Sequence, residues 1–600
     1  MEIPPSSEQQ ESLSDSSPQK QLRPLRVWPA IIAIVLILML RFAPRDLEIM
    51  PLWWLYFSFM GPAVCGLGML VWWGIFSRAT RLEALVGLIA ILSILVMSWF
   101  LAHESMDMAG FMLVTIPIGF VLFGISSLIA RSWTPPARSG FILLITLVGF
   151  ASSLLVRNNG IWGDYNFELA WRWTPTNEEL AIAEQQARTS AGDAIVSEES
   201  FNEWLAEPAW PGFRGPERYS QQSGAELADR WDNVQPELVW KRTIGPAWSS
   251  FVVAGNLLFT QEQRGEHETT ACYTANEGKL VWETEIESRF AEPMGGAGPR
   301  ATPTLAEGQL FAMGASGSLL ALEPRTGDIL WERELKTLAD RGVPVWGFSS
   351  SPLVVEKNVI VHAGGVGEMG VLAFEIEKGE LAWSAVSGNH TYSSPQLCQL
   401  FGKDYVAIYD NQGLRLLDPS TGEVRLEDQW GDGEFRVTQP QVVGEDKIVL
   451  AGGMQDGTRL IQFHVENEKL TAKEVWHSLD LKSDYNDFVV SGDYLYGFDG
   501  SIFTCVDLST GKRKWKRGRY GKGQVLLLTE INRLLVISEK GEVVLLEVNP
   551  EKHVETGTFE AIEGKTWNHP VVVGDRLYVR NAQEAACYRL PTASSELAAK

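Results

Sequence analysis

The stretch Ala321-Leu-Glu-Pro-Arg-Thr-Gly-Asp-Ile-Leu-Trp331 decides the fold, because its pattern returns at regular intervals along the second part of the chain. A small residue, an acid, a Thr-Gly pair and a terminal Trp recur, with the Trp ten positions after the small residue. Related copies run from Cys272 to Trp282, from Ala373 to Trp383 and from Cys505 to Trp515. Each copy is typical of a strand end, a tight turn with Gly in a left-handed conformation and the start of a second strand.

From about residue 238 onward, short runs of Val, Ile, Leu, Phe and Tyr alternate with Gly, Asn and Asp turns, which indicates an all-β domain. The units recur every 39 to 52 residues, as judged by Trp240, Trp282, Trp331, Trp383, Leu426, Trp476 and Trp515. A four-stranded unit of that length is typical of one blade of a propeller. The unit that ends at Leu426 keeps the spacing but has Leu in place of Trp.

The clearest unit predicts four strands, at Pro303–Leu305, Gln309–Met313, Ser318–Glu323 and Asp328–Leu335. Eight such units are expected, and seven is the alternative, because the fifth carries an insertion in Phe463–Trp476 and the seventh lacks a Trp in Leu546–Thr556. The last unit ends before a fourth strand, whereas Glu237–Thr243 is a Trp-bearing strand with no blade of its own. We expect this N-terminal strand to complete the last antiparallel blade and close the ring, which removes an exposed sheet edge.

The N-terminal part contains five apolar stretches, most of them near the ~20 residues that cross a bilayer. They are Val27–Leu40, Leu52–Phe76, Leu82–Leu101, Ala109–Ala130 and Phe141–Val156. No small-x-small cleavage site follows Leu40, so a signal peptide explains the first stretch poorly. No Asp, Glu, Lys, Arg or His lies in the middle of a stretch, which favours a membrane anchor over a transporter.

The basic residues between these stretches predict the orientation of the chain. Seven of them belong on one side: Lys20, Arg23, Arg26, Arg78, Arg81, Arg131 and Arg138. The positive-inside rule places this side, with the N-terminus, in the cytoplasm. We therefore expect a multi-pass protein of the bacterial inner membrane with its propeller in the periplasm. The predicted domains are a disordered cytoplasmic tail (1–26), a transmembrane domain (27–157), a connector with short helices (158–236), the propeller (237–591) and a C-terminal tail (592–600).

The connector predicts two short helices from capping boxes, Thr176–Glu179 and Ser200–Glu203. Its segment Trp210-Pro-Gly-Phe-Arg-Gly-Pro216 combines the Gly and Pro residues typical of turns with two aromatic residues. We interpret this segment as a structural entry loop rather than a ligand site.

Charge and cysteine content exclude some partners and sites. Residues 1–157 carry a net charge of +1 and residues 158–600 a net charge of −24. An acidic surface repels phosphate, so nucleic acid is not an expected partner. The five cysteines include no CxxC pair, and Cys272, Cys505 and Cys587 occupy the position of Ala321 in their units. We expect buried free thiols there and no disulfide.

The repeat resembles the tryptophan-docking motif A-x-[DE]-x-x-T-G-x-x-x-W of pyrroloquinoline-quinone (PQQ) repeat propellers. Ala321–Trp331 and Cys505–Trp515 match it closely, Ala373–Trp383 has Lys for Thr, and Cys272–Trp282 departs at the acid and the Thr. The resemblance covers about residues 237–591 and implies that each Trp docks against the neighbouring blade, with ~1.5–3 kcal/mol or more of burial for each. The expected docking residues are Trp240, Trp282, Trp331, Trp383, Trp476 and Trp515.

Residues just before each inner strand are predicted to converge at the mouth of the central channel. The candidate ligand-binding residues are Trp248, Arg300, Ser350, His390, Tyr392, Gln439, Asp487, Asn568 and His569. Such a polar funnel suits a small ligand or a peptide, and a solvated mouth with no ligand is the alternative. His390 and His569 have no third ligand that spacing identifies, so we expect no metal site.

Two groups share this resemblance, quinoprotein dehydrogenases and non-enzymatic propellers of the BamB type. We expect the second: a membrane-anchored scaffold that binds proteins or peptides in the cell envelope, with no catalytic residue and no cofactor. About 350 residues over eight blades leave little for long active-site loops, and the Ca²⁺-binding set of the dehydrogenases has no assignable counterpart. A PQQ- and Ca²⁺-dependent dehydrogenase is the alternative, because membrane-bound glucose dehydrogenase also has five N-terminal helices. A membrane-coupled sensor is a third interpretation.

Overall fold

The structure is a computed structural model that describes residues 23–42, 52–164, 166–188, 198–431, 435–453, 456–467 and 469–594. It divides into two compact units, Met1–Asn158 with Leu169–Arg172, and Asn159–Glu168 with Trp173–Lys600. The predicted cytoplasmic tail lies outside the described residues up to residue 22, and the predicted C-terminal tail does so from residue 595.

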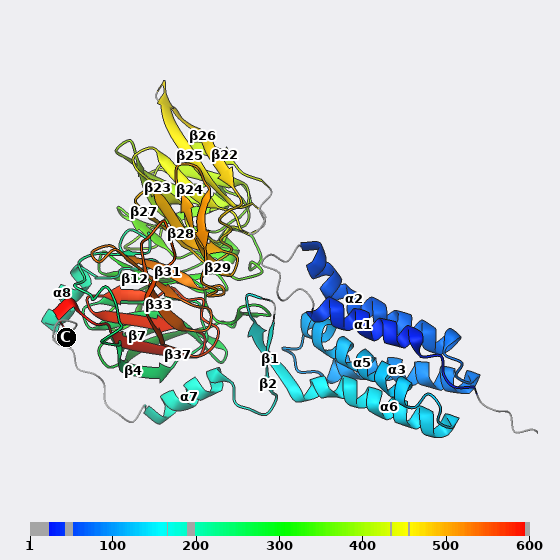
Figure 1. The fold of residues 1–600 in the computed structure, drawn as a ribbon. Helices are drawn as coiled ribbons and strands as arrows, with labels where there is room; N and C mark the ends of the chain where they lie inside the picture. The colour runs from blue at the N-terminus through cyan, green and yellow to red at the C-terminus, as the bar shows by residue number, and fades with distance from the viewer. Residues whose placement is uncertain are drawn as a thin grey trace, which may run out of the picture. The chain divides into compact units, whose positions relative to one another are not determined.

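The first unit is helical (Figure 1). Its elements are α1 (Trp28–Phe42), α2 (Leu52–Val71) with a π-helical continuation (Trp72–Phe76), α3 (Arg81–Leu101), α4 (Met108–Gly110) with a π-helical turn (Phe111–Thr115), α5 (Ile116–Ile129), and α6 (Pro135–Ala151) with a 3-10 turn (Ser152–Leu155). All five predicted apolar stretches are helical. In the described part, four segments are long and apolar enough to cross a membrane, namely Tyr56–Phe76, Arg81–Leu101, Met108–Ile129 and Pro135–Leu155, whereas α1 is shorter.

A buried ion pair joins α3 to α6. Thr80 caps α3 through reciprocal hydrogen bonds with Glu83. The carboxylate of Glu83 also accepts hydrogen bonds of 2.7 to 3.1 Å from Arg138 and one of 3.0 Å from Ser139. Because both charged side chains are buried, each needs the other as a partner, and the pair fixes how these two helices meet.

The second unit contains eight four-stranded antiparallel blades, of which the last includes β4, and the sheet of the seventh has β3 as a fifth, parallel strand. Blades 1 to 4 are β5 (Val252–Ala254), β6 (Leu257–Arg264), β7 (His267–Thr274) and β8 (Leu280–Glu287); β11 (Thr304–Ala306), β12 (Gln309–Met313), β13 (Ser318–Leu322) and β14 (Ile329–Glu334); β15 (Leu353–Val355), β16 (Asn358–His362), β17 (Val371–Glu375) and β18 (Leu381–Ala385); and β19 (Gln396–Leu400), β20 (Lys403–Asp410), β21 (Gly413–Leu417) and β22 (Val424–Gln429). The predicted strands of blade 2 differ from these bounds by at most one residue at each end.

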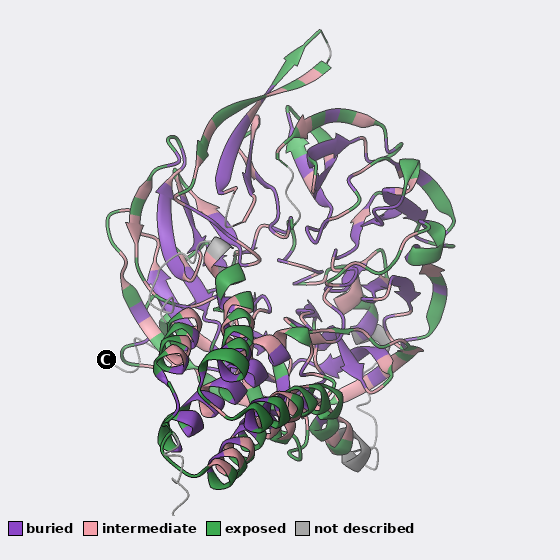
Figure 2. Ribbon diagram, turned by 90° about the vertical axis from the view of Figure 1, so that its right-hand side faces the viewer, coloured by how far each residue is buried: buried purple, intermediate pink, exposed green. Residues whose placement is uncertain are grey.

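Blades 5 to 8 continue the ring, which Figure 2 shows with its buried residues in purple. They are β23 (Gln441–Val443), β24 (Lys447–Ala451), β25 (Thr458–Glu466) and β26 (Lys469–Ser478); β27 (Phe488–Ser491), β28 (Tyr494–Asp499), β29 (Ile502–Asp507) and β30 (Arg513–Lys516); β31 (Gln524–Leu528), β32 (Arg533–Ile537), β33 (Glu542–Glu547) and β34 (Glu555–Glu560); and β35 (Val571–Val573), β36 (Arg576–Arg580), β37 (Glu584–Arg589) and β4 (Glu237–Thr243). The prediction of eight blades is confirmed. The insertion predicted in blade 5 is the long hairpin β25–β26.

The N-terminal strand closes the ring as expected. Strand β4 pairs with β37 as the outer strand of blade 8, and Cys587 lies opposite Trp240. The same register places Ala321 opposite Trp331. The five cysteines are free thiols. In blades 1, 2, 3, 6 and 8 a Cys or Ala thus lies opposite the Trp and leaves room for it, whereas blade 5 has Leu460 opposite Trp476.

Shorter elements complete the second unit: α7 (Asn177–Arg188), α8 (Glu198–Ala206), β3 (Gln221–Gln222), β9 (Ala291–Glu292), β10 (Gly296–Ala297), α9 (Leu335–Leu338) and a 3-10 turn (Gly367–Met369). The hairpin of β1 (Val156–Ile161) and β2 (Phe167–Trp171) begins in the first unit and turns in the second. Thr176 and Glu179 form the predicted capping box, with bonds of 2.6 and 3.0 Å. The second helix begins at Glu198, so the box predicted at Ser200 is wrong.

A tryptophan of one blade lies on a glycine of the next. The indole N–H of Trp331 donates to the carbonyl of Ile376 at 2.7 Å, and a Cβ at Gly379 would lie 2.6 Å from the Trp331 ring. Trp240, Trp282, Trp383, Trp476 and Trp515 each donate to a carbonyl of the following blade at 2.8 to 3.0 Å. A glycine is therefore required in the motif for two reasons: its backbone is left-handed, and the Trp ring occupies the space where a Cβ would lie.

Blade 7 obtains its tryptophan from another part of the chain. Gly557 lies opposite Leu545, at the position where the other blades have a Trp, or Leu426 in blade 4. Trp231, from the connector, covers this glycine, and its backbone N–H donates to Thr556 at 2.8 Å. Trp231 is fully buried. The connector thus supplies a ring at the position where the repeat lacks one.

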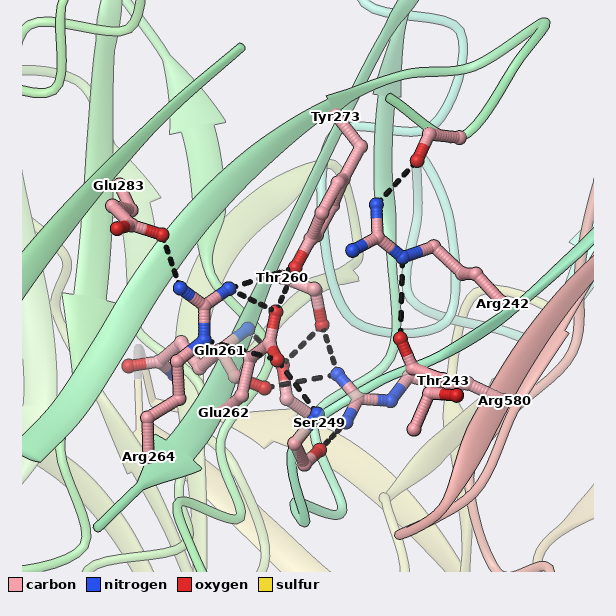
Figure 3. A network of polar contacts seen from close by, with 12 residues as sticks. Arg242, Thr243, Ser249, Thr260, Gln261, Glu262, Arg264, Tyr273, Glu283 and Arg580 are labelled. Carbon is pink, nitrogen blue, oxygen red and sulfur yellow. Dashed lines mark hydrogen bonds and ion pairs between the residues drawn. The ribbon is translucent and has the colours of Figure 1, made fainter. Parts of the chain in front are cut away.

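A buried polar network joins the last blade to the first (Figure 3). Arg580 of blade 8 donates to the Thr260 hydroxyl at 2.6 Å and to the carbonyls of Gln261 and Gly245 at 2.9 Å. Glu262 accepts from Gly245 at 2.7 Å and from Arg264 at 3.1 Å. Although burial raises the pKa of Glu262, Arg264 and Arg580 lower it to about 2. Charge pairing therefore supports the closure of the ring.

Replacing Gly379 by Ala tests the docking contact. Gly379 (φ 65°) and Gly444 (φ 64°) both have left-handed backbones, so an added Cβ strains them alike. A Cβ at Gly379 meets Trp331, whereas one at Gly444 has nothing within 4 Å. We expect Gly379→Ala to lower the free energy of unfolding by about 1–3 kcal/mol more than Gly444→Ala, as measured by chemical denaturation. Equal losses would contradict the argument from the close approach.

The pH dependence of stability tests the closure network. The folded pKa of Glu262 lies below the ~4.3 of an unfolded chain, so its ionised carboxylate stabilises the fold above that pH and loses this effect toward pH 2. Glu262→Gln should be roughly 2–3 kcal/mol less stable than the unmodified chain at pH 6, and the difference should shrink as the pH falls below 4. Denaturation at several pH values measures it. Glu332→Gln, at an exposed acid, is the control, and a gap that persists at low pH would contradict the assignment.

Candidate functional site

The turns that precede the inner strands lie at one end of the ring, which we call the channel mouth. A cavity of about 170 Å³ opens there. Five of the predicted site residues line it: Trp248, Arg300, Tyr392, Asp487 and His569. The structure therefore brings together residues from five different blades and turns that are up to 321 positions apart in the chain.

The other four predicted site residues do not line the cavity, and three of them connect neighbouring blades. Ser350 donates to the carbonyl of Ser393 at 2.9 Å, and Asn568 donates to the carbonyls of Ala247 and Ser249. The amide of Gln439 pairs with the backbone of Ser394, at 2.8 and 2.9 Å, in the orientation that satisfies both of its groups. His390 contacts Tyr392, with 3.0 Å between the ring nitrogen and the phenol oxygen. Ser350, Asn568 and Gln439 thus connect neighbouring blades, whereas His390 contacts a residue of its own turn.

Aromatic side chains that are not among the predicted site residues form much of the cavity wall. On one side Trp567 lies 4.8 Å from Trp248 and 4.7 Å from Tyr485, measured between ring centroids. On the other side Trp346 lies 4.9 Å from Tyr392. Trp567 and Tyr485 are within two positions of predicted residues, so extending the search to aromatic neighbours in the same turns would have found them. Trp346 lies four positions before the predicted residue Ser350, in a longer turn, so a search of the immediate neighbours does not find it.

The floor of the cavity comes from the connector. Residues 210–222, which we call the channel plug, cross the channel between the inner strands. Trp210 exchanges two hydrogen bonds with Val253 of blade 1, and β3 at the other end pairs in parallel with β31 of blade 7. Phe213 lines the cavity and meets His569 edge to face at 5.0 Å. The segment interpreted as an entry loop therefore lies inside the propeller, a position that turn chemistry alone does not reveal.

Arg218 anchors the plug to three blades. Its guanidinium donates to the carbonyl of Pro395 at 2.9 Å, to that of Ser351 at 3.4 Å and to the Thr304 hydroxyl at 3.2 Å, and also to the carbonyl of Pro352. In the part of the chain that the structure describes, its partners are neutral, and burial lowers its pKa to about 9. Five N–H donors suit a site where several strand carbonyls converge.

A buried charge cluster lies beneath the cavity. Arg214 of the plug pairs with Asp487 at 2.7 Å, and the His569 ring lies 3.2 Å from the same carboxylate oxygen. Burial raises the pKa of Asp487, but Arg214 and His569 outweigh it and hold that pKa below its usual range. Burial lowers the pKa of His569. Asp487 is therefore an ionised carboxylate whose charge the plug neutralises.

The remaining charged groups at the mouth are also paired. Arg300 donates to Glu292 at 2.9 Å and to the carbonyl of Gly296 at 2.8 Å. Lys565 donates to the carbonyls of Ile161 and Met294, and its ammonium lies 4.5 Å from the ring centroid of Trp567. Burial lowers the pKa of Lys565 to about 8. These groups are committed to contacts within the protein.

The turn of the β1–β2 hairpin lies on the rim of the mouth. The backbone N–H of Gly163 donates to Glu539 at 2.6 Å, and the indole N–H of Trp567 donates to the same oxygen at 2.9 Å. Lys565 holds the carbonyl of Ile161 at 3.1 Å. The residues 159–168 are thus packed as part of the propeller unit and help to position one wall of the cavity.

The residues present do not fit PQQ and Ca²⁺. PQQ carries three carboxylates, yet Arg300 and Arg214 already pair with Glu292 and Asp487. Among the described residues, His, Cys, Asp and Glu side chains form no group of three or more that would hold a metal ion. The cavity is also smaller than the ~300 Å³ at the low end of small-molecule pockets. We therefore derive no redox chemistry at this site.

The sequence of the propeller matches a known family. Residues 224–347 and 341–517 match the family described as outer membrane protein assembly factor BamB. The propeller belongs to the PQQ-like repeat family. Among curated proteins, the outer membrane protein assembly factor BamB of Shewanella oneidensis is 27% identical over 246 residues, which are 39% of this chain and 53% of that protein. The match thus spans about half the length of this curated relative.

Two solved structures are similar to this PQQ-like propeller chain. The BamB structure from Moraxella catarrhalis has 16% sequence identity and a TM-score of 0.43, and the match covers 59% of this chain and 100% of that one. The quinohemoprotein alcohol dehydrogenase from Comamonas testosteroni has 12% identity and a TM-score of 0.45, and the match covers 69% of this chain and 84% of that one.

A double-mutant cycle tests the charge cluster of the PQQ-like propeller. Arg214→Met leaves the buried carboxylate of Asp487 without its arginine, and we expect a loss of about 3–5 kcal/mol in the free energy of unfolding. Asp487→Asn in the same chain removes the uncompensated charge, so it should recover most of this loss. Chemical denaturation of the two single variants and the double variant measures the coupling. Losses that simply add would contradict the pairing.

Proposed function

We propose that this chain is a membrane-anchored, non-catalytic binding protein of the bacterial cell envelope, and that its propeller holds a protein or peptide partner at the channel mouth. The observation that carries the proposal is the division of roles around the cavity. The charged groups there form ion pairs and hydrogen bonds that hold the plug and the rim in place. Six aromatic side chains line the cavity: Phe213, Trp248, Trp346, Tyr392, Tyr485 and Trp567. Apolar surface in a concave site is what a binding protein offers a partner.

The comparison with known proteins supports the same class of function. The matched family and the Shewanella relative are named as outer membrane protein assembly factors. From that name we carry to this chain only an envelope location and a protein partner. The shared repeat accounts for the fold, so the choice between binding and catalysis rests on the residues at the mouth.

The membrane location is the second part of the proposal. The helical unit contains four segments long and apolar enough to span a membrane. The basic residues cluster on one side of these segments, which favours a cytoplasmic N-terminus and a periplasmic propeller at the inner membrane. In this arrangement the helices anchor the propeller where a periplasmic or membrane-bound partner can reach it.

Photo-crosslinking in living cells tests the partner. The ring of Phe435 is 43% exposed beside Trp346 at the mouth, and that of Phe401 is 42% exposed at the opposite end of blade 4. With p-benzoylphenylalanine at position 435, irradiation should yield a discrete adduct that mass spectrometry identifies as one envelope protein. The same probe at position 401 is the matched control. No adduct at 435, or the same adducts at both positions, would contradict binding at the mouth.

An activity assay tests the absence of catalysis. The purified full chain with PQQ and Ca²⁺ should not reduce an artificial electron acceptor in the presence of alcohols or sugars, because its arginines and carboxylates are committed to one another. Turnover that depends on added PQQ would overturn the non-catalytic assignment and favour a quinoprotein dehydrogenase.

A further inference from the structure

We propose that the mouth cavity binds a single neutral aromatic side chain, presented by an extended segment of the partner polypeptide. This inference rests on the proposed function in taking the partner to be a protein or peptide. It adds the chemistry of the residue that anchors the partner. Size, charge and the surface around the opening each point to this occupant.

The size of the cavity fits one ring. Its volume is about 170 Å³, close to the ~150 Å³ of an engineered apolar cavity that binds benzene. The channel plug closes the bottom, because Phe213 lines the cavity and packs on His569. A larger fused-ring ligand therefore has no room below, and only the tip of a longer molecule is able to enter.

A cation is disfavoured at the aromatic walls. The ammonium of Lys565 already lies 4.5 Å from the Trp567 ring and 5.4 Å from the Trp248 ring. Aromatic cages bind cations through the negative faces of such rings. A lysine or a quaternary ammonium group entering here would meet a charge of the same sign at these faces.

An anion is disfavoured for a different reason. Arg300, which lines the cavity, and Arg214, which lies beneath it, already pair with Glu292 and Asp487. A carboxylate or phosphate entering the cavity would have to displace one of these buried carboxylates. Because separating a buried ion pair is costly, charged ligands of either sign bind less well than a neutral ring.

The surface outside the opening favours a polypeptide over a small molecule. Phe435 stacks on Trp346 at 4.7 Å and is 43% exposed, and Val343 and Val345 in the turn of Trp346 are exposed as well. We call these three residues the apolar rim. Apolar side chains exposed beside a pocket typically mark a contact surface. A peptide whose ring fills the cavity would place its neighbouring residues on this rim.

Synthetic peptides test the proposal with the purified full chain in lipid nanodiscs. The probe is a blocked pentapeptide, Gly-Gly-X-Gly-Gly, with 4-fluorophenylalanine as X, and fluorine NMR follows its binding. We expect saturable binding, which the Phe or Tyr version of the peptide displaces. Versions with Lys, Glu or Ala at X should compete at least about tenfold less well. Equal competition by Lys or Glu would overturn the assignment of a neutral ligand.

Variants locate the binding to the mouth. Trp346→Ala removes one wall, and Ser349→Phe fills the cavity without removing any of its aromatic side chains, so both should weaken binding at least about tenfold. Phe401→Ala, which removes an equally exposed ring at the opposite end of blade 4, should leave binding unchanged. Thermal melting checks that each variant is folded. Unchanged binding in the folded Ser349→Phe chain would overturn the site.

A further ligand tests whether the cavity prefers a peptide to a small molecule. Free 4-fluorotoluene offers the ring without the backbone, and we expect it to bind at least about tenfold more weakly than the peptide, because it does not contact the apolar rim. Equal affinity would overturn the assignment to a polypeptide. Failure of the peptides alongside a specific adduct at position 435 in cells would refute this inference and leave the proposed function standing. Peptide binding without any cellular adduct would refute the proposed function.

Discussion

The contact of a tryptophan ring with a glycine of the next blade is the interaction on which the rest of the propeller depends. It recurs around the ring, as with Trp331 on Gly379 and Trp240 on Gly278. A ring that lies against bare backbone, and donates its N–H to a carbonyl nearby, fixes both the distance and the rotation between two sheets. Among the described residues, the same contact forms at five of the eight junctions between blades, at Gly278, Gly327, Gly379, Gly422 and Gly511. Blade 7 has Gly557 at the position of its Trp, and Trp231 of the connector covers that glycine.

The channel that this ring encloses is filled by the chain itself. Arg218 and Arg214 carry charge into the interior, and each is tolerated for its own reason. Strand carbonyls of several blades surround Arg218, and Asp487 neutralises Arg214. The plug thereby joins blades that do not touch one another and leaves a shallow cavity in place of a tunnel. Its position also explains why the polar residues near the mouth form hydrogen bonds and ion pairs within the protein. These contacts hold the connector and the neighbouring blades in place.

What remains open to a partner is therefore mainly aromatic. Binding energy in such a site comes from burying rings and excluding water, with little contribution from charge. This differs from the polar funnel that the candidate residues suggest when they are read one at a time. Arg300, Asp487 and His569 do line the cavity, but each of them is paired with a charged or titratable group of the protein. The chemistry of the site is thus set by Trp346, Tyr485 and Trp567, which surround them.

The sequence by itself determined the repeat, the closing strand and the apolar helices and predicted eight blades with seven as the alternative, because these features follow from patterns and spacing along the chain. The segment Ala321–Trp331 contains the small residue, the left-handed glycine and the Trp within eleven positions. Their pattern can therefore be recognised from the sequence alone. Only the tertiary structure decided where Trp231, Phe213 and Arg218 go, because nothing in the residues around them encodes contacts with blades that follow up to 356 positions later. The pairing of Asp487 with Arg214 is decided in the same way. It turns a candidate binding carboxylate into a support for the plug, since a buried charge takes its role from the partner that folding brings to it.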